Sequence, residues 1–262
     1  MQNANLLYHK TVVYSIISLL ALPIIATLIY SFSSRWGATI LPDGFTLKWY
    51  GQLFSDIRFL QAFGRSLFVC ITALLLALVL VIPLAFVVFY YYPGYDRLMN
   101  ILILLPFAVP PVVSSVGLLQ FYADAPFPML GTPWILIGTY FTIALPFIYR
   151  AIANNFMAIN LKDLVDAAHL LGASTPKAFF YIILPNLKKG VLASMFLSFS
   201  FLLGEFVFAN ILVGTRYETL QVYLYNMRQT SGHFTSALVM TYFFFIFICT
   251  WLGSRISKSN AL

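Results

Sequence analysis

Long apolar runs alternate with short polar segments along this chain of 262 residues. A helix needs about 20 mostly apolar residues to cross roughly 30 Å of bilayer hydrocarbon. Runs of that length cover residues 11–32, 66–90, 98–122, 133–153, 190–213 and 234–253. The pattern therefore predicts an all-α integral membrane protein with six transmembrane helices.

The first run has the length of a permanent span rather than that of a cleaved signal peptide. Signal peptides carry an apolar core of about 7–15 residues, followed by a small-x-small cleavage site. Residues 11–32 form a longer core, and no such site clearly follows them. Further on, residues 35–56 mix turn residues with aromatics, which predicts a loop and a short helix on the outer surface.

Prolines interrupt the third run at Pro106, Pro110 and Pro111. Each proline removes a backbone donor and clashes with the preceding turn of a helix. Hydrocarbon supplies no replacement partner, so residues 107–112 are expected to be buried in protein or to line a wet cavity. A simple kink against neighbouring helices is the alternative.

Composition supports a membrane protein and excludes other classes. Hydrophobic residues make up 61% of the chain and charged residues 9%, against about 25% charged in soluble domains. The net charge of +7 comes from scattered Lys and Arg, so no nucleic-acid partner is expected. Cys70 and Cys249 lie inside apolar runs and offer neither a disulfide framework nor a metal site.

Sequence patterns for catalysis are missing as well. There is no Gly-x4-Gly-Lys-[Ser/Thr] phosphate loop, no pair of carboxylates and no nucleophile triad at usable spacing. The three histidines are isolated from one another, so no metal set is predicted. By itself this chain is not expected to be an enzyme.

Basic residues indicate the orientation, because cytoplasmic loops of membrane proteins carry more Lys and Arg. With the N-terminus inside, nine basic residues fall on the cytoplasmic side, Arg150 among them, and six on the outer side. Five of the nine lie in residues 154–189 and the adjoining flank. Both termini and that segment are therefore expected in the cytoplasm.

Residues 154–189 predict two short helices joined by a tight bend. Asn160 can cap the first helix, and Asp163 stands where a capping box places an acid. Apolar residues then recur at helical spacing. Gly172 is suited to a left-handed C-cap at the end of this helix.

The second short helix is expected to start at Ser174 or Thr175, either of which can cap it. Pro176 would lie in its first turn, where a proline is well tolerated. Pro185 is expected to end it.

Small side chains at Ala167 and Ala168, flanked by Asp166 and His169, would let another backbone approach the first helix closely. Such a helix suits docking into a groove of a partner protein. An amphipathic helix lying on lipid head groups has the same periodicity. The pattern alone leaves both alternatives open.

In this segment the sequence resembles the permease subunits of binding-protein-dependent ABC importers. The family signature is an acid, two alanines, a glycine after three residues, and Ile-x-Leu-Pro after nine more. It is formed here by Asp166, Ala167, Ala168, Gly172, Ile182, Leu184 and Pro185. The family usually has Glu in place of Asp166, so the charge is kept on a shorter side chain. The resemblance covers about residues 60–255 of an expected single permease domain, 1–262.

The resemblance implies the fold of a type I ABC importer permease in a bacterial cytoplasmic (inner) membrane. In such importers this segment is the coupling helix, which docks in a cleft of a cytoplasmic ATPase dimer. ATP and Mg²⁺ would bind to that ATPase, and no cofactor is expected in this chain. The other implied partners are an external solute-binding protein and a second permease, with a heterodimer favoured.

Glu205 is the only acid well inside a predicted span. A charge at that depth costs about 2.5–3.5 kcal/mol, so it is expected to face the bundle interior or water. It either borders the solute pathway or the seam with a partner permease, or it caps a helix break beside Gly204. Further residues expected to line the pathway are Pro106, Pro110, Pro111, Ser114 and Ser115.

The outer residues 40–54 resemble polyamine-type and aminoalkylphosphonate-type permeases, which implies an amine-bearing solute. Two other functions are open. An ion-coupled secondary transporter would need several buried ionisable residues or an inverted repeat. A membrane scaffold without transport would share the two short helices of residues 154–189 but would need neither the proline-broken third run nor Glu205.

Overall fold

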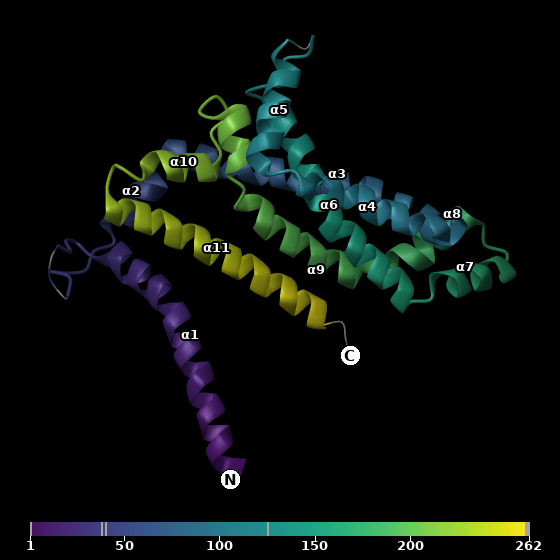
Figure 1. Cartoon of the computed structure of the whole chain (residues 1–262), viewed down its shortest axis with the longest axis horizontal. Coiled ribbons are helices and arrows are strands. Elements are labelled where there is room, and N and C mark those ends of the chain that lie inside the picture. Colours follow the sequence, from purple (N-terminus) through teal and green to yellow (C-terminus); the bar gives the residue numbers. More distant parts are fainter. Residues whose placement is uncertain (1, 38, 40, 125, 260–262) are drawn as a thin grey trace. The chain divides into compact units, whose positions relative to one another are not determined.

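A computed structural model of the chain describes residues 2–37, 39, 41–124 and 126–259. These residues are almost entirely helical, apart from short connections and an isolated bridge between Ser33 and Phe45 (Figure 1). They divide into two compact units, which are described separately. One comprises residues 1–60 and 224–245, and the other comprises residues 61–223 and 246–262.

Aromatic side chains hold the first unit together. Its complete helices are α1 (Gln2–Phe32) and α2 (Lys48–Ser55). The short helix expected within residues 35–56 is therefore confirmed. The ring of His233 stacks on Tyr30 and Trp49, with ring centroids 4.1 and 5.5 Å away. Trp49 also donates an indole hydrogen bond of 2.9 Å to the carbonyl of Ser33, which fastens α2 to the end of α1.

The second unit contains the remaining helices, three of which continue into the first unit. In chain order they are α3 (Ile57–Tyr91), η1 (Pro93–Tyr95), α4 (Asp96–Ala108), α5 (Pro111–Ala123), α6 (Pro133–Ala158), α7 (Leu161–Leu170), α8 (Thr175–Ala178), η2 (Phe179–Ile183), α9 (Leu184–Leu203), η3 (Ala209–Val213), α10 (Leu220–Met227) and α11 (Gly232–Ser259). The η1 segment is a 3-10 turn, whereas η2 and η3 are π-helical turns. The helix with the most buried side chains here is α6, which packs along α9 (Figure 1).

Within the described residues, four helices are long and apolar enough to cross a membrane. They are α1, α3, α6 and α11, and they match the first, second, fourth and sixth apolar runs. The third and fifth runs correspond to two bent helix pairs, so the number of spans is six if each pair is one span. The predicted all-α membrane fold is confirmed, whereas two of the six runs are not single straight helices.

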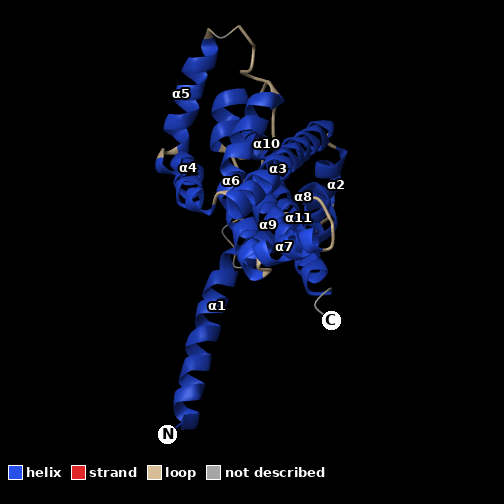
Figure 2. Ribbon diagram, turned by 90° about the vertical axis from the view of Figure 1, so that its right-hand side faces the viewer, coloured by secondary structure: helices blue, strands red, loops and turns tan. Residues whose placement is uncertain are grey.

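The third run is broken into two helices. One segment ends at Ala108, the next begins at Pro111, and the two are bent by 89° (Figure 2). Val109 and Pro110 are extended, with ψ of 126° and 138°. Each precedes a proline, which disfavours the helical conformation of the residue before it. A simple kink is therefore excluded.

The fifth run departs from the prediction at both ends. Its helix ends at Leu203 instead of reaching residue 213, and Gly204 follows. At the other end, helical structure runs from α8 through η2 into α9, so Pro185 does not end the second short helix as predicted. A π-helical turn directly precedes Pro185, and such turns relieve the bonding pattern that a proline disrupts. The halves Thr175–Lys188 and Gly190–Leu203 are bent by 58°.

The close approach of α9 to α6 depends on Gly190. A Cβ atom at this position would overlap the side-chain amide of Asn155 on α6. That amide donates a hydrogen bond of 2.6 Å to the carbonyl of Ala151, which holds it in place. Small residues at helix contacts are the usual means of close packing in membranes. Gly190 is thus a packing residue of this contact.

We expect Gly190→Ala to destabilise the protein by about 1–3 kcal/mol, the usual cost of overpacking a close contact. Thermal unfolding of the detergent-solubilised protein measures this. The double variant Gly190→Ala with Asn155→Ala should recover part of the loss, because the overlapping amide is removed. Gly138→Ala on α6 is the matched control, since a Cβ there meets nothing within 4 Å. A Gly190→Ala variant that melts like the wild type would contradict the packing role.

Candidate functional site

The helix α7 is anchored by one face and exposed on the other. Leu161, Val165 and Ala168 are 5%, 0% and 2% exposed. Leu170 and Leu171 are 90% and 88% exposed, and Ala167 is exposed as well. The predicted pair of small residues is therefore divided, with Ala168 packed inward and the neighbouring alanine facing outward.

The start of α7 differs from the predicted capping box. Asn160 adopts a left-handed conformation, with φ of 49° and ψ of 62°, and its side chain makes no capping hydrogen bond. Its backbone instead connects two helices, because its N–H donates to the carbonyl of Met157 on α6 and its carbonyl accepts from Leu164 on α7. Asn tolerates this conformation better than most residues. The residue therefore makes a tight turn from α6 into α7, and the capping prediction is wrong.

The end of α7 matches the prediction. Gly172 has φ of +83°, which favours glycine. The N–H of Ala173 donates to the carbonyl of Ala168 at 3.0 Å, and that of Gly172 donates to the carbonyl of His169 at 2.9 Å. This pair of bonds is a Schellman motif. It sets the angle between α7 and the following segment.

Hydroxyl groups connect α7 and α8, together called the docking segment, to α3. Tyr90 donates to the carboxylate of Asp166 at 3.0 Å, and Tyr91 donates to the hydroxyl of Thr175 at 3.4 Å. The same hydroxyl lies 3.2 Å from the Nε2 atom of His169. Neither Thr175 nor Ser174 caps α8 with its side chain. The tyrosines at the end of α3 are contacts that sequence reasoning missed, although three consecutive tyrosines at an interface are a visible signal.

The other signature residues lie on the helical segment that follows. Ile182 is half-buried in η2, and its carbonyl accepts a hydrogen bond of 2.8 Å from the Asn186 side chain. Leu184 is half-buried and Pro185 is exposed, both in the first turn of α9. These three residues shape the junction between the docking segment and α9 rather than the exposed face of α7.

Glu205 caps the break after α9. Its two carboxylate oxygens accept hydrogen bonds from the N–H groups of Phe208 at 2.8 Å and Ala209 at 3.2 Å. The hydroxyl of Tyr140 on α6 lies 3.5 Å from its carbonyl oxygen. An acid at the start of a helical turn satisfies free N–H groups and is favoured by the helix dipole. The capping alternative is therefore present in the structure.

The same residue also lines a cavity of about 760 Å³, here called the Glu205 cavity. Its walls come from the broken α4–α5 segment, from α6, from the end of α9 and from the residues after it. Of the expected lining residues, Pro106, Pro111, Ser114 and Glu205 border it. Pro110 and Ser115 do not. Ser115 is fully buried and donates to the carbonyl of Pro111 at 2.7 Å, which bonds it within its own helix.

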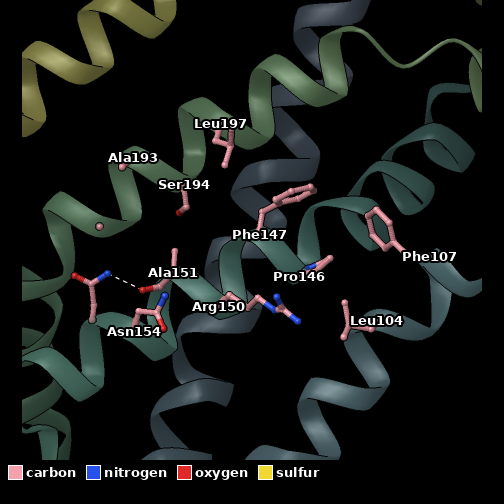
Figure 3. A pocket seen from close by; sticks show the side chains of 12 residues that line it. Leu104, Phe107, Pro146, Phe147, Arg150, Ala151, Asn154, Ala193, Ser194 and Leu197 are labelled. Atoms are coloured by element: carbon pink, nitrogen blue, oxygen red, sulfur yellow. Dashed lines mark hydrogen bonds between the residues drawn. The ribbon is translucent and has the colours of Figure 1, made fainter. Parts of the chain in front are cut away.

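A second cavity of about 620 Å³ lies between α4, α6 and α9, and is here called the Arg150 cavity (Figure 3). Most of its lining is apolar, from Leu104, Phe147 and Leu197 among others. Arg150 and Asn154 contribute polar groups to it from α6. Sequence reasoning missed this site because it used Arg150 only as a basic residue that indicates orientation, although the predicted run 133–153 contains it.

Three aromatic rings stand where the two cavities adjoin. Phe107 lines both cavities, Phe147 lines the Arg150 cavity and Phe201 lines the Glu205 cavity. The ring of Phe147 lies 6.2 Å from that of Phe107 and 5.4 Å from that of Phe201, measured between centroids. These rings are called the aromatic row. The row thus connects the linings of two cavities, each of which also contains an ionisable side chain.

No group of three His, Cys, Asp or Glu side chains in the described part of the chain is placed to hold a metal ion.

Comparison with known proteins identifies the family. Residues 83–259 match the model of the binding-protein-dependent transport system inner membrane component. The spermidine/putrescine transport system permease protein PotC of Escherichia coli strain K12 is 30% identical over 218 residues, which cover 81% of this chain and 79% of PotC. PhnV of Salmonella typhi, named as a 2-aminoethylphosphonate transport system permease, is 27% identical over 206 residues, which cover 79% and 77%.

Solved structures have the same fold. A bacterial ABC transporter involved in the import of the acidic polysaccharide alginate matches with a TM-score of 0.76 and 15% identity, over 97% of both chains. The MetNI methionine ABC transporter, in inward-facing conformations, matches with a TM-score of 0.58 and 16% identity, over 76% of this chain and 94% of that chain. The chain therefore belongs to the binding-protein-dependent inner membrane components and is a permease subunit of an ABC importer.

Proposed function

We propose that this chain pairs with a second permease to form the pathway for a small solute delivered by an external binding protein. ATP is hydrolysed on a separate cytoplasmic ATPase dimer, which docks on the exposed face of α7. Both termini and the α7–α8 segment lie in the cytoplasm. The second permease is a different chain, so that the membrane part is a heterodimer.

The observation that carries this proposal is the exposed apolar end of α7. Leu170 and Leu171 are almost completely exposed, next to a glycine turn that fixes their position. Burying a leucine side chain contributes about 1.5–3 kcal/mol. Two adjacent exposed leucines on an anchored helix therefore favour a partner that covers them. A protein groove fits this arrangement, because the helix is already ordered.

The contacts of Asp166 favour a positioning role within the docking segment. Its carboxylate accepts a hydrogen bond from Tyr90 of α3. Through this bond and the one between Tyr91 and Thr175, force on α7 and α8 reaches the end of a transmembrane helix. The residue is thus proposed to hold α7 at its angle rather than to reach into the ATPase.

The pathway is proposed to pass the two cavities, with the aromatic row between them. Phe147 is central to the row because its ring adjoins both of the others. Glu205 borders the pathway and also stabilises the turn that shapes its wall. The solute is proposed to be small and amine-bearing, supported by the names of the relatives PhnV and PotC.

The first experiment is purification of the tagged protein in mild detergent, followed by mass spectrometry and an ATPase assay with candidate binding proteins. Co-purification of an ATPase and a second permease, with hydrolysis stimulated by one binding protein, is the expected result. A chain that purifies alone, without ATPase activity, would overturn the proposal and favour a scaffold.

For the docking face, we expect Ala167→Trp and Leu170→Asp to reduce binding-protein-stimulated ATPase activity about tenfold or more, corresponding to about 1.4 kcal/mol. Membrane insertion and thermal stability should stay unchanged, because both side chains are exposed. Ala168→Trp is the contrasting variant, since this buried position should lose stability instead. Wild-type stimulation in both exposed variants would refute the docking assignment.

For the aromatic row, we expect Phe147→Ala to allow solute flux without ATP in proteoliposomes containing the assembled complex. The ring of Phe147 lies between those of Phe107 and Phe201, so its removal would leave a gap that joins the two cavities. Radiolabelled solute uptake in the absence of ATP measures the leak. Phe180→Ala is the control, because that ring is 60% exposed and lies outside the row. A tight Phe147→Ala complex would show that the row is not a barrier.

A further inference from the structure

Arg150 is the first charged residue of a helix that is long and apolar enough to cross a membrane. This helix, α6, has 26 residues, Pro133–Ala158. Residues 133–149 before Arg150 carry no charged side chain, and the arginine side chain is exposed. A charge that follows such a long apolar stretch is expected to face protein or water rather than lipid.

The donors of Arg150 have no partner in the described part of the chain. No hydrogen bond, ion pair or ring contact engages its guanidinium among these residues, and the same is true of the Asn154 side chain. The neighbouring polar groups are already used. Asn155 donates to the carbonyl of Ala151, and Ser194 donates to the carbonyl of Val191. Arg150 and Asn154 are both exposed, and both line the same cavity.

These donors come from residues four apart on α6. Residues four apart lie on the same face of a helix, one above the other. Figure 3 shows Arg150 and Asn154 on the same helix at the wall of the Arg150 cavity. A guanidinium binds carboxylate and phosphate-type oxygens through paired hydrogen bonds. The side-chain amide adds a further donor.

We propose that Arg150 and Asn154 bind an anionic group of the transported solute, a phosphonate, phosphate or carboxylate. This inference rests on the proposed function and narrows its solute class. An aminoalkylphosphonate-type solute carries such a group. A polyamine does not, and the guanidinium repels it. The two carboxylate oxygens of Glu205 already accept backbone N–H groups, so that acid does not offset the repulsion.

Glu205 and Arg150 are too far apart along α6 to contact one small solute at the same time. Tyr140, beside Glu205, is on the same helix as Arg150 and lies about 15 Å before it along the axis. A small solute cannot reach across that distance. Passage from one cavity to the other therefore includes a crossing of the aromatic row, and the anion site holds the solute on the side where Asn154 lies.

Cysteine protection in the assembled complex tests this site. Ala193→Cys, on α9 at the cavity wall, supplies a reporter in a background where Cys70 and Cys249 are Ala. The complex is placed in phosphatidylcholine nanodiscs and labelled with N-ethylmaleimide. Methylphosphonate and 2-aminoethylphosphonate should slow labelling, whereas spermidine should not. In Arg150→Gln, half-protection should need about tenfold more phosphonate, since a charge-assisted contact is lost.

Matched variants separate the explanations. Lys188→Gln removes an exposed charge elsewhere and should keep full protection, and Arg150→Lys should keep part of it. Equal protection in Arg150→Gln and the parent, or no protection by either phosphonate, would overturn the site. Phosphatidylglycerol in the nanodiscs is the third arm. If it alone blocks labelling and phosphonate adds nothing, the anion is a lipid headgroup and the solute assignment fails.

The readout is independent of the proposed transport cycle. Labelling needs neither ATP nor a binding protein, so protection can be measured even if no ATPase stimulation occurs. Stimulated ATP hydrolysis without protection of the cysteine would refute only the anion site. Protection of the cysteine without stimulated ATP hydrolysis would support the anion site and refute the proposed transport cycle.

Discussion

The packing of α9 against α6 is the contact on which the functional parts of the second unit depend. Gly190 permits it, because any side chain there would overlap Asn155. Both cavities take part of their walls from these two helices, and the docking segment α7–α8 connects the end of one to the start of the other. In hydrocarbon, two apolar helices gain little by hiding from solvent, so close fit decides where they meet. The glycine thus sets the geometry of three sites at once.

Breaks in the spans follow the rule that backbone groups in a membrane must find partners within the protein. The break at residues 109–110 borders a cavity, and the break after Leu203 is bonded by the carboxylate of Glu205. Glu205 therefore stabilises the fold through hydrogen bonds that a solute would have to break in order to bind its carboxylate. Arg150, in the second cavity, makes no such bond within the described residues. The electrostatic character of the proposed pathway consequently depends more on Arg150 than on Glu205.

Much of the fold could be predicted from apolar run length, since the requirement of about 20 residues is set by the bilayer and is independent of tertiary contacts. Gly172 was equally predictable, because few residues adopt its positive φ. Asn160 was not, because its left-handed turn depends on how α6 leads into α7. The prediction that Pro185 ends the second short helix failed for a related reason. Whether a proline ends a helix depends on the turn before it, and a π-helical turn has no clear sequence signal.

The candidate site, like the fold, could be predicted from the sequence only in part. The signature from Asp166 to Pro185 located the docking segment, and one intramembrane acid led to the first cavity. The division between Ala167 and Ala168 needed the observed burial, because a stripe of small residues does not show which side is covered. Arg150 lies inside the predicted run 133–153, but a count of basic residues does not show which of them line a cavity.

The bend beside Gly190 has a mechanical consequence. The segments Thr175–Lys188 and Gly190–Leu203 meet at the point where α9 presses on α6. Each is about 21 Å long at 1.5 Å per residue, so the contact acts as the fulcrum of a lever with equal arms. Rotation of both segments as one body by about 10° would move each end by about 4 Å. Because the arms are equal, the movement is not amplified, and the displacement at the docking end limits how far the pathway end can travel.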